Sequence, residues 1–439
     1  MLVGRAGFLN PRVAAMRPHG IKFIPLPGRA TGVARISIEV FCMNRPEKFP
    51  SARGPHIASR MEGIEPFHVV VLINRAKELE AQGRSIANMV VGEPDAPTPP
   101  LIAAAGIRAI ESGRISYTSS LGIAELRDSI AGWYHTRYGV EVPRSRAVVT
   151  AGSSGALLLT MGVLLSPGDQ VLMADPGYPC NRHFVRTMEG EAVGIPVGAD
   201  TAYQLTAKLV EKYWTEKTVA VLIASPSNPT GTLIDHGELQ RIHAAVKVRG
   251  GVLIVDEIYH GLTYGKRDRS ALEFADDVFI INSFSKYFGM TGWRLGWMIA
   301  PEQYIAQVDK LAQNLFISPS DLAQQAALAA FHPDTVALLE KRRDAFREQR
   351  DFLLPELRSL GFDIPVTPEG AFYIYANCER LTSDSYKFCW DVLEKAGVAI
   401  APGRDFGDHL AKQHVRFSYP KSIPVLAEGV ERLRKYLKK

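Results

Sequence analysis

Six short apolar runs, separated by segments with the patterns of helices and turns, constrain the fold of this chain most strongly. They occupy residues 147–151, 170–174, 220–224, 252–255, 278–282 and 295–300. Continuous apolar strands that alternate with helices are typical of a mostly parallel sheet that is covered on both faces. We therefore predict an α/β fold, in which a mostly parallel seven-stranded sheet forms a large domain and a smaller α+β domain accompanies it.

The length of the chain, 439 residues, also favours more than one domain, because a domain has roughly 100–200 residues. We expect the large domain to cover residues 90–330 and the small domain to combine residues 61–89 with 331–439. The apolar periodicity predicts further helices over residues 67–83, 101–112, 124–138, 157–165, 335–360, 383–396 and 425–437. Further strands are predicted over residues 86–91, 372–375, 398–401 and 415–418.

Residues 1–60 differ from the rest of the chain, because they carry scattered Gly and Pro and no clear periodicity. We interpret them as an N-terminal extension with a short arm, either because translation begins at Met43 or because the segment is disordered. An organellar transit peptide is a further alternative, although serine is sparse there. Six basic residues and one acidic residue up to Cys42 account for the whole net charge of +5. The remainder is neutral and has no basic stripe interleaved with aromatic residues, so we expect no nucleic-acid partner.

The four cysteines form no C-x-x-C pair and have no histidine at the spacing of zinc ligands. We therefore predict no metal site. Free thiols in a chain of this length favour a reducing, cytoplasmic location. No run reaches the roughly 18 apolar residues that a membrane span needs, so we expect no membrane partner.

Residues suited to bind a flat anionic ligand follow the predicted strands, at the edge where open parallel sheets bind ligands. Ser153 and Ser154 lie in a small-residue turn that opens a helix, where backbone amides can bind a phosphate; the alternative is simple helix capping. Tyr178, in Asp-Pro-Gly-Tyr-Pro, could stack on an aromatic ring, or it could pack beside a turn. Asn228, in Asn-Pro-Thr-Gly, is a candidate ligand of a ring substituent or a residue of an ordinary tight turn.

A carboxylate and a lysine follow the next two strands. Asp256 ends an apolar strand, where a carboxylate is costly unless a cation pairs with it, and Tyr259 lies near the same edge. A cationic ring nitrogen or an arginine could be that partner. Lys286 follows Ser283 among small and aromatic residues, and burial lowers the pKa of a lysine, so that its amine can form a Schiff base. The alternative is a surface lysine in a loop.

Two arginines complete the set. Arg294 offers a planar fork for a phosphate, and Arg416 lies in an apolar strand, where a substrate carboxylate or a structural salt bridge would satisfy it. Taken together, these residues describe a phosphorylated aromatic aldehyde with a basic ring nitrogen. That ligand is pyridoxal 5′-phosphate, which needs a lysine Schiff base and an acidic partner for its ring.

The chain resembles the class I/II family of pyridoxal-phosphate aminotransferases, of the aspartate-aminotransferase fold. The resemblance covers about residues 92–419 and rests on Gly-Ser-Ser-Gly-Ala, Asp-Pro-Gly-Tyr-Pro, Asn-Pro-Thr-Gly, Asp-Glu-Ile-Tyr, Ser-Phe-Ser-Lys, Gly-Trp-Arg-Leu-Gly and Arg-Phe-Ser. It implies that Lys286 binds the cofactor, that Asp256 pairs with the ring nitrogen, that Tyr259 and Asn228 contact the ring hydroxyl and that Tyr178 stacks on the ring. It implies a phosphate site made by Ser153, Ser154, Ser283 and Arg294.

The resemblance also implies that Arg416 and the backbone of Gly92 bind the substrate α-carboxylate, and that Tyr117 reaches the phosphate of a partner subunit in a homodimer. The expected activity is amino-group transfer between an L-amino acid and a 2-oxo acid by a ping-pong mechanism. A carbon–sulfur lyase on the same fold is the first alternative, and an aminotransferase-like sensor domain of a regulator is the second. We find no second arginine for a side-chain carboxylate, which puts strict specificity for aspartate or glutamate in doubt.

Overall fold

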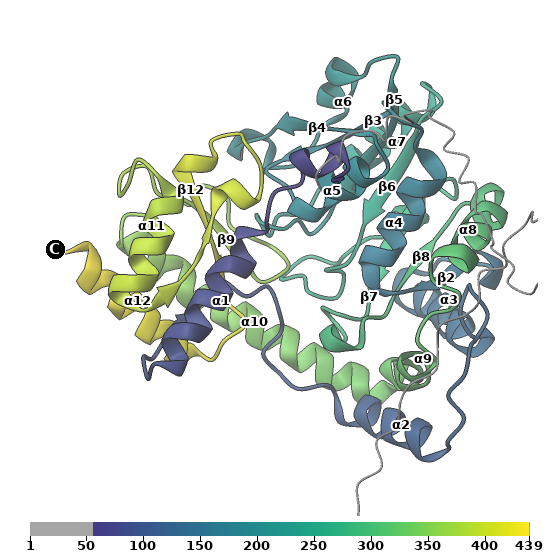
Figure 1. Cartoon of the computed structure of the whole chain (residues 1–439), viewed down its shortest axis with the longest axis horizontal. Helices are drawn as coiled ribbons and strands as arrows, with labels where there is room; N and C mark the ends of the chain where they lie inside the picture. The colour runs from purple at the N-terminus through teal and green to yellow at the C-terminus, as the bar shows by residue number, and fades with distance from the viewer. Residues whose placement is uncertain (1–55, 439) are drawn as a thin grey trace, which may run out of the picture. The chain divides into compact units, whose positions relative to one another are not determined.

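The computed structural model describes residues 56–438, and a seven-stranded sheet lies at the centre of this part of the chain (Figure 1). Its strand order is β2-β8-β7-β6-β5-β3-β4. The six neighbouring pairs are parallel except that β8 runs antiparallel to both β2 and β7. The predicted mostly parallel sheet is therefore confirmed. Its strands are β2 (Ala147–Thr150), β3 (Gln170–Asp175), β4 (Glu191–Pro196), β5 (Thr218–Ala224), β6 (Val252–Asp256), β7 (Phe279–Ser283) and β8 (Gly296–Ile299).

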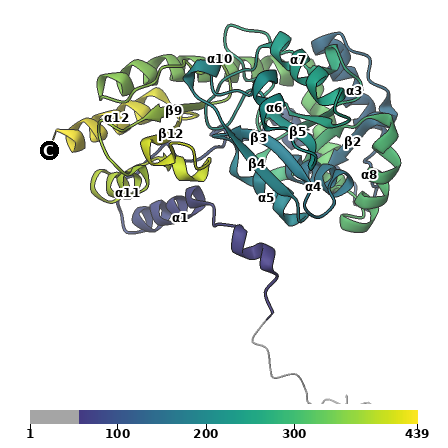
Figure 2. The ribbon, with the colours of Figure 1, turned by 90° about the horizontal axis from the view of Figure 1, so that it is seen from above.

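Both faces of this sheet are buried, as its continuous apolar strands require. Successive residues of β6 alternate between two hydrophobic clusters, with Ile254 in one and Leu253 and Val255 in the other. Seen from above, α4 and α5 lie on one side of the strands and α3 and α7 on the other (Figure 2). The helices around this sheet are α2 (Pro100–Glu111), α3 (Ala124–Tyr138), α4 (Gly152–Leu164), α5 (Pro179–Thr187), α6 (Ala207–Tyr213), α7 (His236–Lys247), α8 (Glu302–Leu315) and α9 (Asp321–Ala327).

Two small sheets lie beside the large one. An antiparallel sheet has the order β11-β12-β9, and β1 pairs with β10 in parallel. Figure 1 shows β9 and β12 together with α1, α11 and α12, while α10 extends from this group towards α9. The strands are β1 (Ala87–Asn88), β9 (Tyr373–Asn377), β10 (Val398–Ala399), β11 (Ala401–Pro402) and β12 (His414–Ser418), and the helices are α1 (His68–Ala81), α10 (Pro333–Ser359), α11 (Ser385–Asp391) and α12 (Ile423–Leu437).

The structure corrects several predicted boundaries. The strand predicted over residues 86–91 shrinks to Ala87–Asn88, and the strand predicted over 398–401 is divided between β10 and β11, which join different sheets. The helix predicted over 383–396 ends its regular part at Asp391 and continues as a π-helical turn, Val392–Ala396. Sequence analysis missed β4. The division of residues 61–439 into two domains stays a prediction.

The predictions for residues 1–55 lie outside the described residues. The last two residues of the extension predicted over residues 1–60 belong to a 3-10 turn, Ser59–Gly63. None of the helices that the structure describes is both long and apolar enough to cross a membrane.

Candidate active site

A cavity of about 250 Å³ lies at the carboxyl ends of the central strands, next to the small antiparallel sheet. This is the edge at which open parallel sheets bind ligands. The cavity brings together ten of the twelve predicted site residues. They are Gly92, Ser153, Ser154, Tyr178, Asn228, Asp256, Tyr259, Lys286, Arg294 and Arg416.

Lys286 follows the end of β7 and extends its amine into this cavity, where Nζ donates a hydrogen bond to the Gly92 carbonyl at 2.7 Å. The rings of Tyr259 and Phe372 each lie 5.9 Å from Nζ. Burial lowers the pKa of Lys286 from 10.5 to about 8, and the charge of Arg416 acts in the same direction, while Glu93 opposes it. The amine is therefore easier to deprotonate than an ordinary lysine, as a nucleophile must be.

Asp256 is the last residue of β6, and only 4% of its surface is exposed. Its Oδ1 accepts the amide of Ile258 at 3.1 Å, and no side chain within residues 56–438 forms an ion pair with it. Burial raises the pKa of Asp256 to about 7, although the Ile258 amide and Lys286 both oppose the rise. Because a buried carboxylate is costly without a cation, a positively charged ligand would gain from binding here.

Two tyrosines form a pair at the side of the cavity. The hydroxyls of Tyr259 and Tyr373 lie 2.8 Å apart, and their rings meet edge to face. Burial raises the pKa of Tyr259 well above its ordinary value, so the phenol stays neutral and can donate a hydrogen bond. A Cβ built on Gly92 would lie 2.5 Å from the Tyr373 hydroxyl oxygen, so this position has room only for glycine.

The end of the cavity at which α4 begins is suited to bind an anion. The helix starts at Gly152, directly after β2, so Ser153 and Ser154 occupy its first turn rather than the turn that we predicted before it. Free amides and the helix dipole favour an anion at such a position. The guanidinium of Arg294 lies close to the start of this helix: a Cβ built on Gly152 would be 2.8 Å from Arg294 Nη2. Gly152 has a φ of 70°, which favours glycine independently.

Arg416 lies in β12, and only 2% of its surface is exposed. Its guanidinium donates to Asn228 Oδ1 at 3.0 Å and to the Val90 carbonyl at 2.7 Å, and both acceptors are uncharged. Its Nε has no hydrogen-bond partner among the described residues. The guanidinium packs over the rings of Tyr373 and Phe406, at 4.4 Å and 4.9 Å from their centroids. A buried cation without a carboxylate is suited to an anionic ligand.

The other two predicted site residues do not line the cavity. Ser283 is buried, and its hydroxyl donates to Ser285 Oγ at 2.9 Å, so Ser285 lines the cavity in its place. Tyr117 is 81% exposed and does not line this cavity.

The cavity is also lined by Tyr373, Ser285, Glu93 and the first turns of α1, which we did not predict from the sequence. Tyr373 lies in the strand predicted over residues 372–375, but only the pairing of β9 with β12 brings it beside Arg416. Ser285 could have been recognised from the sequence, because it lies directly before Lys286 in the Ser-Phe-Ser-Lys motif.

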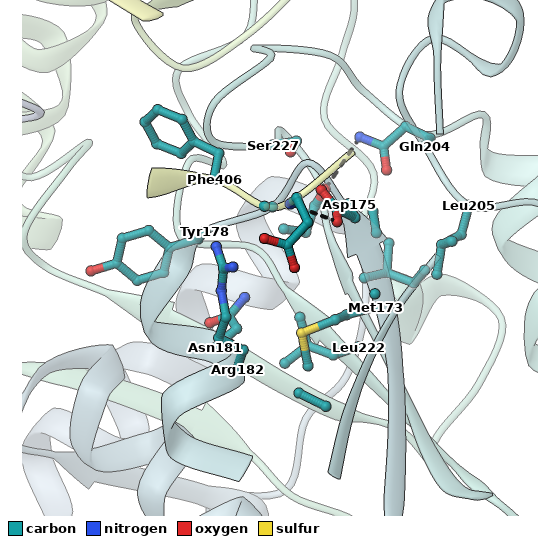
Figure 3. A pocket seen from close by; sticks show the side chains of 18 of the residues that line it. Met173, Asp175, Tyr178, Asn181, Arg182, Gln204, Leu205, Leu222, Ser227 and Phe406 are labelled. Carbon is teal, nitrogen blue, oxygen red and sulfur yellow. Dashed lines mark hydrogen bonds between the residues drawn. The ribbon is translucent and has the colours of Figure 1, made fainter. Parts of the chain in front are cut away.

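A second, smaller cavity of about 90 Å³ lies on the other side of Tyr178, which lines both cavities. Figure 3 shows Tyr178 and Phe406 on one side of it and Gln204 and Leu205 on the opposite side. Asp175 Oδ2 accepts the amides of Asp408 and His409 at 3.0 Å and 3.2 Å, which ties the end of β3 to the loop after Phe406. Tyr178 is thereby held between two connected parts of the chain.

Comparison with known proteins finds one family and many relatives. Residues 84–433 match the family described as aminotransferase class I and II. The valine–pyruvate aminotransferase of Mycobacterium tuberculosis is 38% identical over 377 residues, which are 85% of this chain and 97% of that protein. A crystal structure of an aminotransferase from Mycobacterium tuberculosis has a TM-score of 0.85 and 38% identity, and covers 88% of this chain and 100% of that chain. The aspartate aminotransferase of Thermus thermophilus with maleate has a TM-score of 0.82 and 31% identity, over 87% and 99% of the two chains.

Proposed function

The chain belongs to the aminotransferase class I and II family and is a transaminase with the aspartate-aminotransferase fold, and we propose that Lys286 is the residue that holds its cofactor. The family depends on pyridoxal phosphate. One observation carries the proposal: a lysine with a lowered pKa faces the same cavity as a buried carboxylate that has no ion-pair partner among the described residues.

The residues of the cavity fit pyridoxal 5′-phosphate. Arg294 and the first turn of α4, with Ser153 and Ser154, would hold the phosphate, and the site has room because position 152 lacks a Cβ. Ser283 would support this end through Ser285, to which its hydroxyl donates. Asp256 would pair with the ring nitrogen, Tyr259 and Asn228 would contact the ring hydroxyl, and Tyr178 would stack on the ring.

When bound, the cofactor supplies an electron sink for the substrate carbon that loses a proton. Lys286 would supply the base, because its amine has a lowered pKa of about 8 and in its neutral form could take the proton from the substrate Cα. As a carboxylate, Asp256 would pair with the ring nitrogen and favour its protonated form, because a buried carboxylate is stabilised by a cation. The neutral phenol of Tyr259 donates a hydrogen bond and keeps a charge out of the buried site.

Arg416 would bind the α-carboxylate of the substrate. Its Nε is unpartnered among the described residues and its other nitrogens donate only to uncharged oxygens, so a carboxylate would supply the missing anion. The Gly92 backbone lies next to Lys286 Nζ and can orient the same end of the substrate. One such anchor serves amino acids and 2-oxo acids alike, as a ping-pong exchange between the two requires.

We infer a homodimer in which Tyr117 completes the phosphate site of the partner subunit. In support, Tyr117 is an aromatic residue with 81% of its surface exposed, and it lies outside the cavity of its own chain. Sedimentation equilibrium should give about twice the chain mass of 48.3 kDa, and a monomer would contradict this inference. The cytoplasmic location stays a prediction from the free thiols.

The assignment of Lys286 is tested by replacing it. Lys286→Ala should remove the visible absorbance of the purified holoenzyme and lower amino-group transfer by a factor of at least about 10³, because both the covalent anchor and the base are lost. Lys266→Ala is the matched control, since Lys266 is an exposed lysine in a surface ion pair with Glu369. An unchanged visible band in Lys286→Ala would contradict the assignment. Ammonia and a 2-oxo acid formed without an acceptor would instead favour the lyase alternative.

A further inference from the structure

We propose that the side chain of the amino donor lies against an apolar wall formed by the start of α1, so that this enzyme prefers donors with an apolar side chain. The inference rests on the proposed function, and in particular on Arg416 as the anchor of the α-carboxylate. It adds an element that determines specificity for the amino donor. The names of the relatives do not indicate one donor, since one is called a valine–pyruvate aminotransferase and another an aspartate aminotransferase.

The start of α1 is held at the end of the cavity where Arg416 lies. The amides of His68 and Val69 donate to the two carboxylate oxygens of Asp405, at 2.8 Å and 2.7 Å. The next residue, Phe406, packs its ring against the Arg416 guanidinium at 4.9 Å. Asp405 therefore connects the first turn of α1 to the surroundings of Arg416, so a substrate anchored by Arg416 lies close to this turn.

The surface that α1 adds to the cavity is entirely apolar. One of the α1 side chains in this surface, Val70, is 46% exposed. The apolar surface continues across the cavity in Val91 and Ile258, which lie outside α1. An apolar substrate side chain would cover this surface and remove it from water, which is favourable in proportion to the area covered. The apolar residues concerned are Phe67, Val69, Val70, Ile73, Val91 and Ile258.

The charges of the cavity argue against a second carboxylate on the substrate. Among the described residues that line the cavity, the cations are Lys286, Arg294 and Arg416, and each is already assigned to the cofactor or to the α-carboxylate. Glu93 and Asp256 are the lining carboxylates. A distal carboxylate would therefore lose its hydration without gaining a cation, and Glu93 would repel it.

The experiment titrates the holoenzyme with single L-amino acids and follows the change of its visible band. L-Leucine and L-valine should reach half-saturation at concentrations at least about tenfold below those for L-aspartate and L-glutamate. A second readout does not need turnover: calorimetry should show that 4-methylpentanoate, which lacks an amino group, binds more tightly than glutarate.

Two variants locate the effect on α1. Val70→Ala and Ile73→Ala should each raise the ratio of the leucine to the alanine half-saturation concentration by about three- to tenfold, because each removes apolar contact area. Val71→Ala is the matched control: it is the same substitution one residue further along the helix, at a side chain that is 40% exposed but does not line the cavity.

The outcomes separate this inference from the proposed function. A preference for L-aspartate or L-glutamate, with the band still responding, would overturn the apolar wall alone and point to a cation from elsewhere, such as a partner subunit. Equal effects of Val70→Ala and Val71→Ala would also overturn it. A visible band that responds to no amino acid would contradict the proposed function itself, and the inference with it.

Discussion

Burial gives Lys286, the proposed cofactor lysine, a lower pKa than an ordinary lysine has. Its amine lies among aromatic rings and two arginine charges, and among residues 56–438 its one hydrogen-bond acceptor is the Gly92 carbonyl. With a pKa of about 8, about one molecule in ten carries a neutral amine at pH 7, against fewer than about one in a thousand at the ordinary value of 10.5. Reactivity at neutral pH is therefore a property of the folded cavity.

The pH dependence of cofactor uptake tests this account of Lys286. The rate constant for binding of pyridoxal phosphate to the cofactor-free protein should rise with pH and level off above a midpoint near 8, because only the neutral amine attacks the aldehyde. Glu93→Gln should move the midpoint to a lower pH, since the negative charge of Glu93 raises the pKa of Lys286. Stopped-flow absorbance measures both rates, and a midpoint near 10 in the wild-type chain would contradict the prediction.

At the scale of residues, sequence motifs predicted most of the cavity but not its side-chain directions. Ten predicted residues line it, because strand ends in a parallel sheet converge on one edge. The motif could not show that the Ser283 hydroxyl turns inward to Ser285 and the Leu295 carbonyl. Tyr373 was missed because its place beside Tyr259 depends on contacts between residues 114 positions apart.

At the scale of elements, the buried strands were predictable, including the edge strand β2, and the largely exposed edge strand β4 was not. The five central strands of the sheet are continuous apolar runs, whereas β4, at one end of the strand order, contains Glu191, Gly194 and Pro196 and is largely accessible. Edge strands need no apolar residues on both faces, so their sequences carry a weaker signal. The predicted strand 398–401 fails for another reason, since Ile400 carries the chain from one small sheet to the other.

The first turn of α1 gives a prediction at the scale of elements, because Asp405 and Asp384 each accept two amides at the start of a helix. Asp405→Ala should lower the free energy of unfolding by about 1 kcal/mol, as the loss of a helix cap does, and raise KM for the amino donor, because α1 loosens over the cavity. Asp384→Ala, at the start of α11, should cost similar stability without changing KM. Urea denaturation and steady-state kinetics check both variants, and equal KM values for the two would contradict a role of α1 in binding.

At the scale of the whole molecule, the candidate active site depends on contacts between distant parts of the chain. Residues 67–92 supply α1 and the Gly92 carbonyl, the end of β6 supplies Asp256, the loop after β7 supplies Lys286, and β12 supplies Arg416. The alternation of strands and helices predicted the sheet, since local patterns record local structure. The position of α1 could not be read from the sequence, because it depends on Asp405, more than 330 residues away.

The half-reaction of the holoenzyme tests the central claim, that this cavity transfers an amino group through Lys286, most directly. Purified enzyme mixed with L-leucine and no acceptor should release about one 2-oxo acid per subunit and no ammonia, because the amino group stays on the enzyme. Pyruvate added afterwards should restore the original absorbance and yield L-alanine. Release of ammonia, or of many 2-oxo acid molecules per subunit without an acceptor, would contradict the claim.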